Sequence, residues 1–336
     1  MRVESANRLR HRAGSSDGHY ESYFIRANHA ERAWAFWIRY TIFSPLDRPH
    51  DALGELWAIV FDGERNRHVA VKQDWPLASC RFDTEALAVE LPGAQLGSGH
   101  ASGHAMGGGE SSGHRIVWDL RFAGGQSPLL LLPERLYDGG FPKAKSLVGR
   151  PLARFDGTLT VDGQRIDVQG WLGSQNHNWG RQHTDRYAWG QVAGFDGGHD
   201  ESFLEVASAK LKLGPLWTPW ITPIVLRHRG REHRLNALGR SLRARASVQG
   251  FDWRFESQDE GVRVRGHIQA GRGDFVGLHY ANPPGGIKQC LNSKIARAEV
   301  TLQHADGSSE TLISQRRAAF ELLGDDGFNH GVPMAC

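Results

Sequence analysis

The feature that most constrains the fold of this chain is a period of two in its hydrophobic pattern. Short aromatic and β-branched runs occur at residues 20–28, 33–43, 55–62 and 66–75, and Gly, Pro, Asp and Asn separate them. This spacing is typical of consecutive antiparallel strands, because the side chains of a strand point alternately to its two faces. Helical periodicity is almost absent. The pattern therefore predicts an all-β protein.

The second half of the chain shows the same alternating pattern, interrupted by clear turns. Residues 154–170 predict a hairpin that turns at Asp162 and Gly163, and residues 246–269 predict a meander of alternating inward and outward side chains. The 41 glycines suit the bends and bulges of curved sheets. At 336 residues the chain is long enough for two domains, each with its own core. We therefore expect barrels or sandwiches in two domains.

One segment, residues 92–114, interrupts the alternation with Gly, Ser and widely spaced His. Its composition offers little apolar area to offset the entropy of ordering, so it is predicted to be a mobile surface loop. Weak capture of a metal ion by His100, His104 and His114 is the alternative interpretation.

Charge is balanced along the chain, with 40 basic and 37 acidic side chains. No large positive field follows from this balance, so nucleic acid is not expected as a partner. Residues 226–246 alternate Arg with apolar residues, which is typical of half-buried strands with solvated outer faces. This basic segment is therefore not interpreted as a binding site.

Cysteine content and hydropathy bear on the cellular location of the protein. Cys80, Cys290 and Cys336 are an odd set without metal-ligand spacing, so we expect reduced, structural thiols. No apolar run approaches the ~20 residues of a membrane-spanning helix, and no apolar stretch follows the basic amino terminus. We expect a cytoplasmic protein without an integral membrane segment, and a transient contact with a membrane surface stays open.

Residues 170–191, GWLGSQNHNWGRQHTDRYAWGQ, combine aromatic rings with proton-handling and hydrogen-bonding groups. Three interpretations are open. In the first, the segment fills a core through the rings of Trp171, Trp179, Tyr187 and Trp189. In the second, it holds a metal through His177, His183 and Asp185. These three match no ligand pattern of a helix or strand face, so neither a metal nor a cofactor is predicted.

In the third interpretation the segment lines an apolar ligand cavity. His177, or a carboxylate such as Asp185 or Glu205, would exchange a proton, while indole faces stabilise positive charge. A small barrel offers a mouth and an interior of suitable apolar character. This arrangement suits cation chemistry on alkenes.

The segment GWLGSQNHNWG, followed by a Trp-rich strand, and the later GLHYANPPGGIKQCLNSKIARAEVTL carry a family resemblance. The chain resembles the AttH and hydroxyneurosporene synthase (carotenoid 1,2-hydratase) family, which is related to tocopherol cyclase and fungal Diels–Alderases. The resemblance runs from about Tyr20 to Leu302. It implies two tandem lipocalin-like antiparallel β-barrel domains, which we place at residues 1–185 and 186–336.

The resemblance also implies site residues. The His-x-Trp element of the hydratases matches His177 and Trp179, and Glu205 is the nearest counterpart of a carboxylate on the next strand, where a neighbouring phenol is replaced by Leu204. The candidate catalytic residues are thus His177, Trp179, Glu205 and Asp185. The candidate ligand-binding residues are Trp171, Asn176, Asn178, Tyr187, Trp189, Trp217, Trp220 and Tyr280. Trp217 and Trp220 lie in a Pro-rich segment that would form either a lid or an edge covering the barrel end.

These observations together predict binding of a hydrophobic small molecule of polyene, terpenoid or polyketide type. Acid-assisted hydration, cyclisation or isomerisation of that molecule is the predicted activity. A binding protein without catalysis is the alternative. A sugar-binding protein is a third class, because Trp also stacks on sugars, but the segment lacks the two facing carboxylates of a glycosidase.

Overall fold

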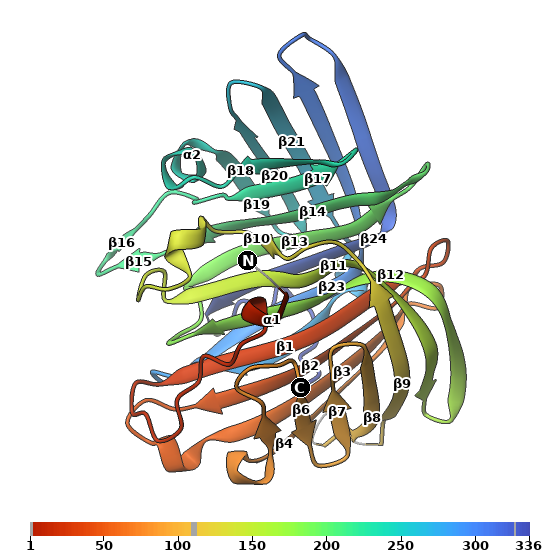
Figure 1. Ribbon diagram of the computed structural model, residues 1–336, viewed down its shortest axis with the longest axis vertical. Coiled ribbons are helices and arrows are strands. Elements are labelled where there is room, and N and C mark those ends of the chain that lie inside the picture. Colours follow the sequence, from red (N-terminus) through yellow and green to blue (C-terminus); the bar gives the residue numbers. More distant parts are fainter. Residues whose placement is uncertain (1–2, 109–112, 326) are drawn as a thin grey trace.

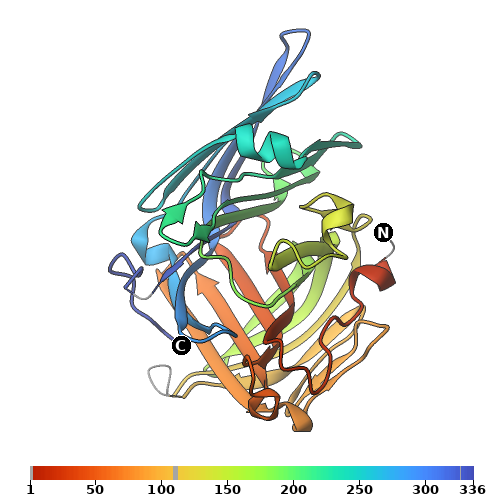
Figure 2. The same cartoon turned by 90° about the vertical axis from the view of Figure 1, so that its left-hand side faces the viewer.

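Two curled antiparallel sheets, one from each half of the chain, are stacked on each other in the computed structural model, which describes residues 3–108, 113–325 and 327–336 (Figures 1 and 2). Within these residues the helices are short: α1 (Val3–Ala6) and α2 (Leu238–Arg243). No helix among the described residues is both long and apolar enough to cross a bilayer. The predicted all-β, lipocalin-like class is confirmed.

The first sheet has the strand order β4-β3-β2-β1-β12-β11-β9-β8-β7-β6-β5, and β10 pairs with β11. Its strands are β1 (His19–Asn28), β2 (Trp34–Ser44), β3 (Leu53–Asp62), β4 (Arg67–Pro76), β5 (Arg81–Phe82), β6 (Val89–Leu91), β7 (Ala94–Leu96), β8 (His100–Met106), β9 (Arg115–Gly124), β10 (Leu129–Leu130), β11 (Ala144–Val161) and β12 (Gln164–Gly180). The four runs read from the sequence correspond to β1–β4 within two residues at each end. The curl brings β8 back to β4, where the Met106 N–H donates to Gln73 Oε1 at 2.9 Å.

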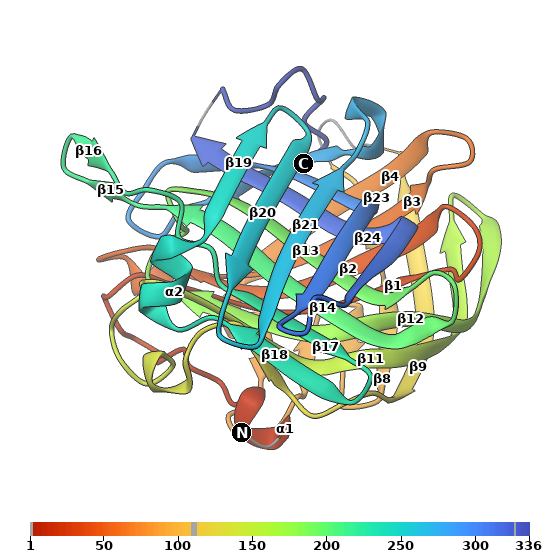
Figure 3. The ribbon, with the colours of Figure 1, turned by 90° about the horizontal axis from the view of Figure 1, so that it is seen from above.

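The second sheet has the order β18-β17-β14-β13-β24-β23-β21-β20-β19, and β22 pairs with β23. Its strands are β13 (Arg186–Phe195), β14 (His199–Lys210), β17 (Ile224–His228), β18 (Arg231–Leu235), β19 (Arg245–Gln249), β20 (Asp252–Gln258), β21 (Val262–Gln269), β22 (Val276–Ala281), β23 (Ile287–His304) and β24 (Ser309–Asp325). The predicted meander at residues 246–269 corresponds to β19–β21. A separate hairpin, β15 (Lys212–Leu213) with β16 (Leu216–Trp217), projects from the side of the protein (Figure 3).

The predicted mobile loop at residues 92–114 is wrong for ten of its residues, which form two strands. Strands β7 and β8 occupy residues 94–96 and 100–106, and β8 pairs with β9. Ala101 and Ala105 are fully buried, so small side chains suffice where main-chain hydrogen bonds hold the strand. His100 contacts Asp119 and His114 contacts Asp162, in separate ion pairs. Residues 109–112 lie outside the described part of the chain.

The basic segment at residues 226–246 also departs from its prediction in part. Strands β17 and β18 are present, but α2 replaces the expected strand at residues 238–243. Leu238 and Leu242 are exposed, so this turn of helix buries no continuous apolar face. The alternation of Arg with Leu in this segment is therefore not a strand signal throughout.

The three largest apolar cores of the described residues follow from this arrangement. One lies inside the curl of the first sheet, where the Trp118 indole N–H donates to the Tyr40 hydroxyl across the core at 3.2 Å. A second lies on the inner face of the second sheet and contains Trp253 and Phe320. The third is formed between the sheets and includes Trp37 from β2. Both faces of the central strands are thus buried, which leaves no solvated face on β1 or β2.

The chain passes from the first sheet to the second between Gly180 and Arg186. The proposed domain boundary after residue 185 falls in this link, and separate folding of the two halves stays a prediction. Two glycines before the link are required by close backbone approach. A Cβ at Gly173 would lie 1.8 Å from the Arg26 carbonyl oxygen, and one at Gly180 would lie 2.2 Å from that of Lys143. Gly173 and Gly180 of the segment GWLGSQNHNWG therefore serve strand packing.

Candidate functional site

Residues 170–191 run from the end of β12 into β13, and strand alternation divides the β12 side chains between two faces. His177 is in register with Tyr23, whose ring lies in the core inside the first sheet. Asn176 is in register with Phe24, whose ring lies between the sheets. Because side chains alternate, His177 and Trp179 face the inside of the first sheet, and Asn176 faces the second sheet.

His177 is fully buried and hydrogen-bonded at both ring nitrogens. Its Nε2 lies 2.8 Å from Glu21 Oε1, and its Nδ1 lies 2.7 Å from the Ala6 carbonyl oxygen. Both contacts are hydrogen bonds only when the ring carries two N–H groups, because both partners are acceptors. The Tyr23 ring stacks on the imidazole with 4.3 Å between centroids, and Trp179 lies 4.7 Å from it.

Glu21 is the centre of this buried cluster. Its carboxylate also accepts hydrogen bonds from the backbone N–H groups of Arg10 and His11 and from His19 Nε2, at 2.6 to 3.0 Å. Burial alone would raise the pKa of Glu21, but the hydrogen bonds from His177 and His19 outweigh it and lower the pKa to about 2. The amino-terminal segment thus seals this end of the first sheet over a saturated carboxylate.

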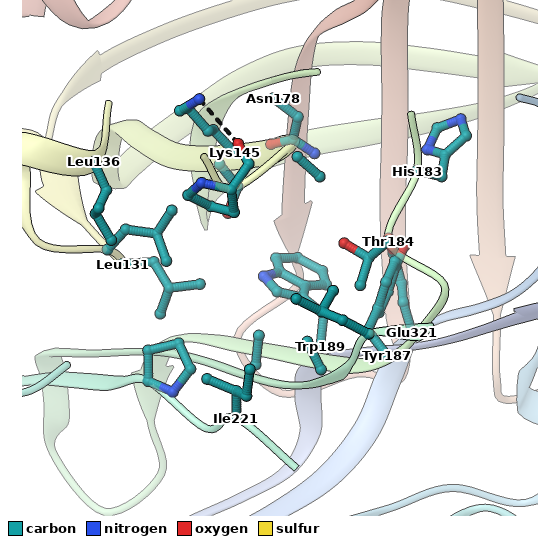
Figure 4. A pocket seen from close by; sticks show the side chains of 18 of the residues that line it. Leu131, Leu136, Lys145, Asn178, His183, Thr184, Tyr187, Trp189, Ile221 and Glu321 are labelled. Atoms are coloured by element: carbon teal, nitrogen blue, oxygen red, sulfur yellow. Dashed lines mark hydrogen bonds between the residues drawn. The ribbon is translucent and has the colours of Figure 1, made fainter. Parts of the chain in front are cut away.

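A cavity of about 200 Å³ lies between the two sheets. Figure 4 shows Leu131 and Leu136 on one side and Tyr187 and Trp189 across from them. The polar side chains in its wall are those of Tyr20, Arg39, Lys145, Ser146, Asn178, His183, Thr184, Tyr187, Asn236, Ser241, Tyr280 and Glu321. Of the predicted residues, Asn178, Tyr187, Trp189 and Tyr280 line this cavity, whereas His177 and Trp179 do not. The cavity is thus bounded by apolar side chains with a few convergent polar groups, as in small-molecule sites.

Tyr187 and Glu321 form a phenol–carboxylate pair in the cavity wall, although they come from different strands. The Tyr187 hydroxyl donates to Glu321 Oε2 at 3.3 Å. The other oxygen, Oε1, accepts from Lys294 Nζ at 2.8 Å and from Asn292 Nδ2 at 3.0 Å. Burial strongly raises the pKa of Tyr187, so its proton stays in place at neutral pH. Burial likewise lowers the pKa of Lys294, against the field of Glu321.

Glu205 lies behind the cavity wall rather than in it. Its Oε1 accepts from the Trp189 indole N–H at 2.7 Å, and its Oε2 accepts from Gln191 Nε2 at 2.8 Å. Burial raises the pKa of Glu205 to about 7, although these two hydrogen bonds oppose the shift. Gln191 also donates to Asn176 Oδ1 at 2.8 Å, which places Asn176 in the same buried network. Glu205 therefore carries a proton in part of the molecules at neutral pH and positions Trp189.

The remaining predicted residues lie apart from the cavity. Trp171 packs in the core inside the first sheet, 6.1 Å from the Phe36 ring. Asp185 accepts from the Lys212 backbone N–H at 2.9 Å. Trp217 is 40% exposed on the projecting hairpin. Trp220 lies under Lys210 Nζ at 4.9 Å.

Sequence reasoning missed several polar residues of the cavity: Arg39, Lys145, His183 as a cavity residue, and Glu321. Arg39 is the one Lys, Arg, Asp or Glu residue of β2, and Glu321 is the one such residue in the buried run 318–324 of β24. That isolation was the available signal, because a charge inside an apolar run needs a partner or a function. Burial lowers the pKa of His183 to about 3, so its imidazole is neutral.

One cluster has donors suited to a metal ion, at the rim of the second sheet away from the cavity. Donor atoms of His199, His228 and Glu310 lie within 4.8 Å of one another. Arg229 contacts Glu310 Oε1 at 2.8 Å, and Ser202 Oγ lies 2.7 Å from His228 Nδ1. Hydrogen bonds and ion pairs account for this cluster without a metal.

The stacked curled sheets and the cavity between them define a lipocalin-like fold with two sheets. Three solved structures share it over nearly the whole chain. A protein described as a putative AttH from Nitrosomonas europaea superposes with a TM-score of 0.57 and 12% identity, covering 93% of this chain and 94% of that one. Kievitone hydratase from Nectria haematococca has a TM-score of 0.53 and 11% identity, covering 97% and 95%.

The third structure is that of CghA with Sch210972, with a TM-score of 0.54 and 13% identity, covering 92% of this chain and 89% of that one. The predicted likeness to AttH-like, lipocalin-type proteins is confirmed for the fold, and at these identities the likeness extends to the fold alone. No protein-family model and no curated protein sequence matches the chain.

Proposed function

We propose that the protein binds a hydrophobic polyene-, terpenoid- or polyketide-like molecule between its two sheets and catalyses its acid-assisted hydration, cyclisation or isomerisation. The observation that carries this proposal is that the two carboxylate oxygens of Glu321 are hydrogen-bonded to different extents. Oε1 is held by two short hydrogen bonds, whereas Oε2 has only long contacts, with Tyr187 at 3.3 Å and Cys290 Sγ at 3.9 Å. An oxygen bonded so weakly at a cavity wall keeps capacity to accept a proton.

Tyr187 and Glu321 divide the proton transfer in this proposal. Tyr187 donates its hydroxyl hydrogen toward a substrate oxygen or alkene carbon as charge develops there. Glu321 accepts a proton from an attacking water or from a substrate C–H group and then returns it to the Tyr187 phenolate along their hydrogen bond, so that both residues regain their starting protonation after one turnover. The general-acid role that the sequence assigned to His177 or an inward carboxylate falls to Tyr187 in this proposal, because His177 faces the other side of its sheet.

Trp189 supports this chemistry as the aromatic wall next to the pair. Lys294 Nζ lies 5.4 Å from its ring centroid, so the indole already accommodates a positive charge. A cation over an indole is stabilised by about 2 kcal/mol when desolvated. Glu205 holds the Trp189 indole in place by accepting a hydrogen bond from the indole N–H. The structures of a hydratase and of CghA with a bound small molecule agree with such a role for this fold.

A route for a hydrophobic ligand is offered by the projecting hairpin. Leu213 and Leu216 are 64% and 71% exposed beside Trp217. The chain just before and just after the hairpin, at Leu211 and Ile221, lines the cavity. Exposed apolar side chains next to lysines suit a transient contact with an anionic membrane surface. Sedimentation with phosphatidylglycerol vesicles tests this, and Leu216→Asp should reduce the bound fraction.

Mass spectrometry of molecules that co-purify with the protein tests the central proposal. We expect a polyene, terpenoid or polyketide from the wild type. Ala209→Phe fills the cavity and should abolish its capture, whereas Ala86→Phe, at an exposed position, should not. Equal capture by both variants would place the ligand elsewhere. Incubation of the purified protein with the identified molecule then shows whether a product forms.

A further inference from the structure

Arg39, on β2, is a buried cation in the wall of the cavity. Its side chain is 6% exposed. Its Nε and Nη2 both donate to Ser22 Oγ, at 2.9 and 2.7 Å. In the part of the chain that the structure describes, no carboxylate lies within ion-pair distance of it. A guanidinium has five N–H donors, so this one keeps most of its hydrogen-bonding capacity toward the cavity.

The groups around Arg39 hold its charge without neutralising it. The guanidinium carbon lies 4.6 Å from the Tyr280 ring centroid and 5.9 Å from that of Trp37. On the other side of Tyr280 is the His183 ring, at 5.5 Å between centroids, which is neutral because burial and the Arg39 charge lower its pKa. Aromatic faces attract a cation but do not replace the hydrogen bonds that water would give it.

The carboxylates nearest in the same region already have cationic partners. Glu321 is bonded to Lys294 at 2.8 Å, and Glu55 is bonded to Lys72 at 2.9 Å. The cationic side chains of the cavity wall are those of Arg39 and Lys145, and in the described part of the chain neither has a carboxylate within ion-pair distance. Lys145 Nζ donates to the carbonyl oxygens of Gly139 and Pro142, whereas the guanidinium of Arg39 is bonded only to the Ser22 hydroxyl. An unpaired buried charge is costly for folding, and such groups are typically paired with a counter-ion.

We infer that the ligand is an amphiphilic acid, whose carboxylate or other anionic oxygen group binds Arg39 while its apolar body fills the rest of the cavity. This inference rests on the proposed function. The planar guanidinium suits two parallel hydrogen bonds to a carboxylate, with Ser22 fixing its orientation from behind. Arg39 is thus a binding and specificity residue, distinct from the Tyr187–Glu321 pair.

Isothermal titration calorimetry with geranic acid and geraniol tests the inference, because the two share one terpenoid body and differ in the carboxylate. The wild type should bind geranic acid at least about tenfold more tightly, the effect of one charge-assisted hydrogen-bonded contact. In Arg39→Met this ratio should fall to near one, with geraniol affinity unchanged. Arg39→Lys keeps the charge and should retain part of the ratio. Arg165→Met, at an exposed ion pair with Asp167, is the control and should keep the wild-type ratio.

Equal affinities in the wild type, or a ratio that survives in folded Arg39→Met, would overturn the inference and leave hydrophobic binding intact. Failure of the wild type to bind either molecule would contradict the proposed function for terpenoids and this inference together. A melting temperature of ligand-free Arg39→Met at or above that of the wild type supports a role in binding rather than folding, since an apolar side chain of similar length removes a buried charge. The wild-type ratio decides the question even if a variant fails to fold.

Discussion

The two buried carboxylates Glu21 and Glu321 are surrounded in opposite ways. Glu21, inside the first sheet, has both oxygens occupied by ring, hydroxyl and backbone donors, all at 3.2 Å or less. Glu321, between the sheets, has one oxygen held by short bonds and the other in long contacts at a cavity wall. Each pairs with an aromatic proton carrier, His177 in one case and Tyr187 in the other.

This difference in hydrogen bonding and cavity contact distinguishes a structural polar cluster from a reactive one. A saturated carboxylate without contact to a cavity stabilises the segments that donate to it, here the amino-terminal residues. A carboxylate with spare acceptor capacity beside a cavity contributes less to folding and can take up a proton from a ligand. The two clusters should therefore respond in opposite ways to removal of their aromatic partners.

The largest effects are expected when the aromatic partner in each cluster, His177 or Tyr187, is replaced. His177→Ala breaks a buried ion pair and should lower the free energy of unfolding by about 3 kcal/mol. Tyr187→Phe removes one long hydrogen bond and should lower it by about 1 kcal/mol or less. Product formation should fall by about 100-fold in Tyr187→Phe. Urea unfolding and a product assay measure the two quantities.

His177→Gln serves as the matched control, since its amide can still donate to Glu21 and should recover part of the stability. If folded His177→Ala loses product formation while its unfolding free energy stays at the wild-type value, the assignment of the two clusters is reversed. The same reversal follows if Tyr187→Phe is the less stable variant.

An effect of similar size should appear in the pH dependence of stability, where Glu21 and Glu205 act with opposite sign. The pKa of Glu21 falls from 4.5 to about 2 on folding, so its contribution is present above pH 4.5 and is lost as the pH falls toward 2. The pKa of Glu205 rises from 4.5 to about 7, so the folded state binds the extra proton and stability declines as the pH rises from 4.5 to 7. Each contribution is roughly 3 kcal/mol across its window.

Variants isolate the two contributions. Glu21→Gln should flatten the acid limb of the stability curve, and Glu205→Gln should flatten the decline between pH 4.5 and 7. Glu90→Gln, at an exposed position, should change neither limb. A Glu205→Gln curve that still declines between pH 4.5 and 7 as in the wild type would show that another group titrates there.

The sequence predicted the fold well and the site only in part, and the physical reasons differ. The strand signal of β1–β3 is strong because large rings and β-branched residues occupy both buried faces of these strands. It is weak in β8, where Ala101 and Ala105 fill the inner positions and the composition is that of a loop. Strands of that kind are held by neighbours that a local pattern does not contain.

The site depends on which face of each strand meets the second sheet, and alternation alone does not settle this. The segment SQNHNW correctly drew attention to β12, yet its two sets of side chains face different cores. Tyr187 was predicted as a ligand contact, but its partner Glu321 lies 134 residues away along the chain. Pairing of that kind is set by the order of strands β13 and β24 in the sheet, which is a tertiary property.

The smallest expected effect is a difference in ligand affinity between variants of Trp189 and Trp179, both of which were predicted from the sequence to be site residues. Trp189→Phe removes the indole N–H that fixes Glu205 and thins the cavity wall, so the affinity for geraniol should fall by about threefold to tenfold. Trp179→Phe changes a ring next to His177 and should leave that affinity within about twofold. Titration calorimetry of both variants at one pH gives the comparison, and circular dichroism checks that each is folded. Equal losses in the two variants would mean that the Trp179 side of β12 senses the ligand as strongly as the cavity wall on β13 does, and the division between a structural and a reactive cluster would then have to be abandoned.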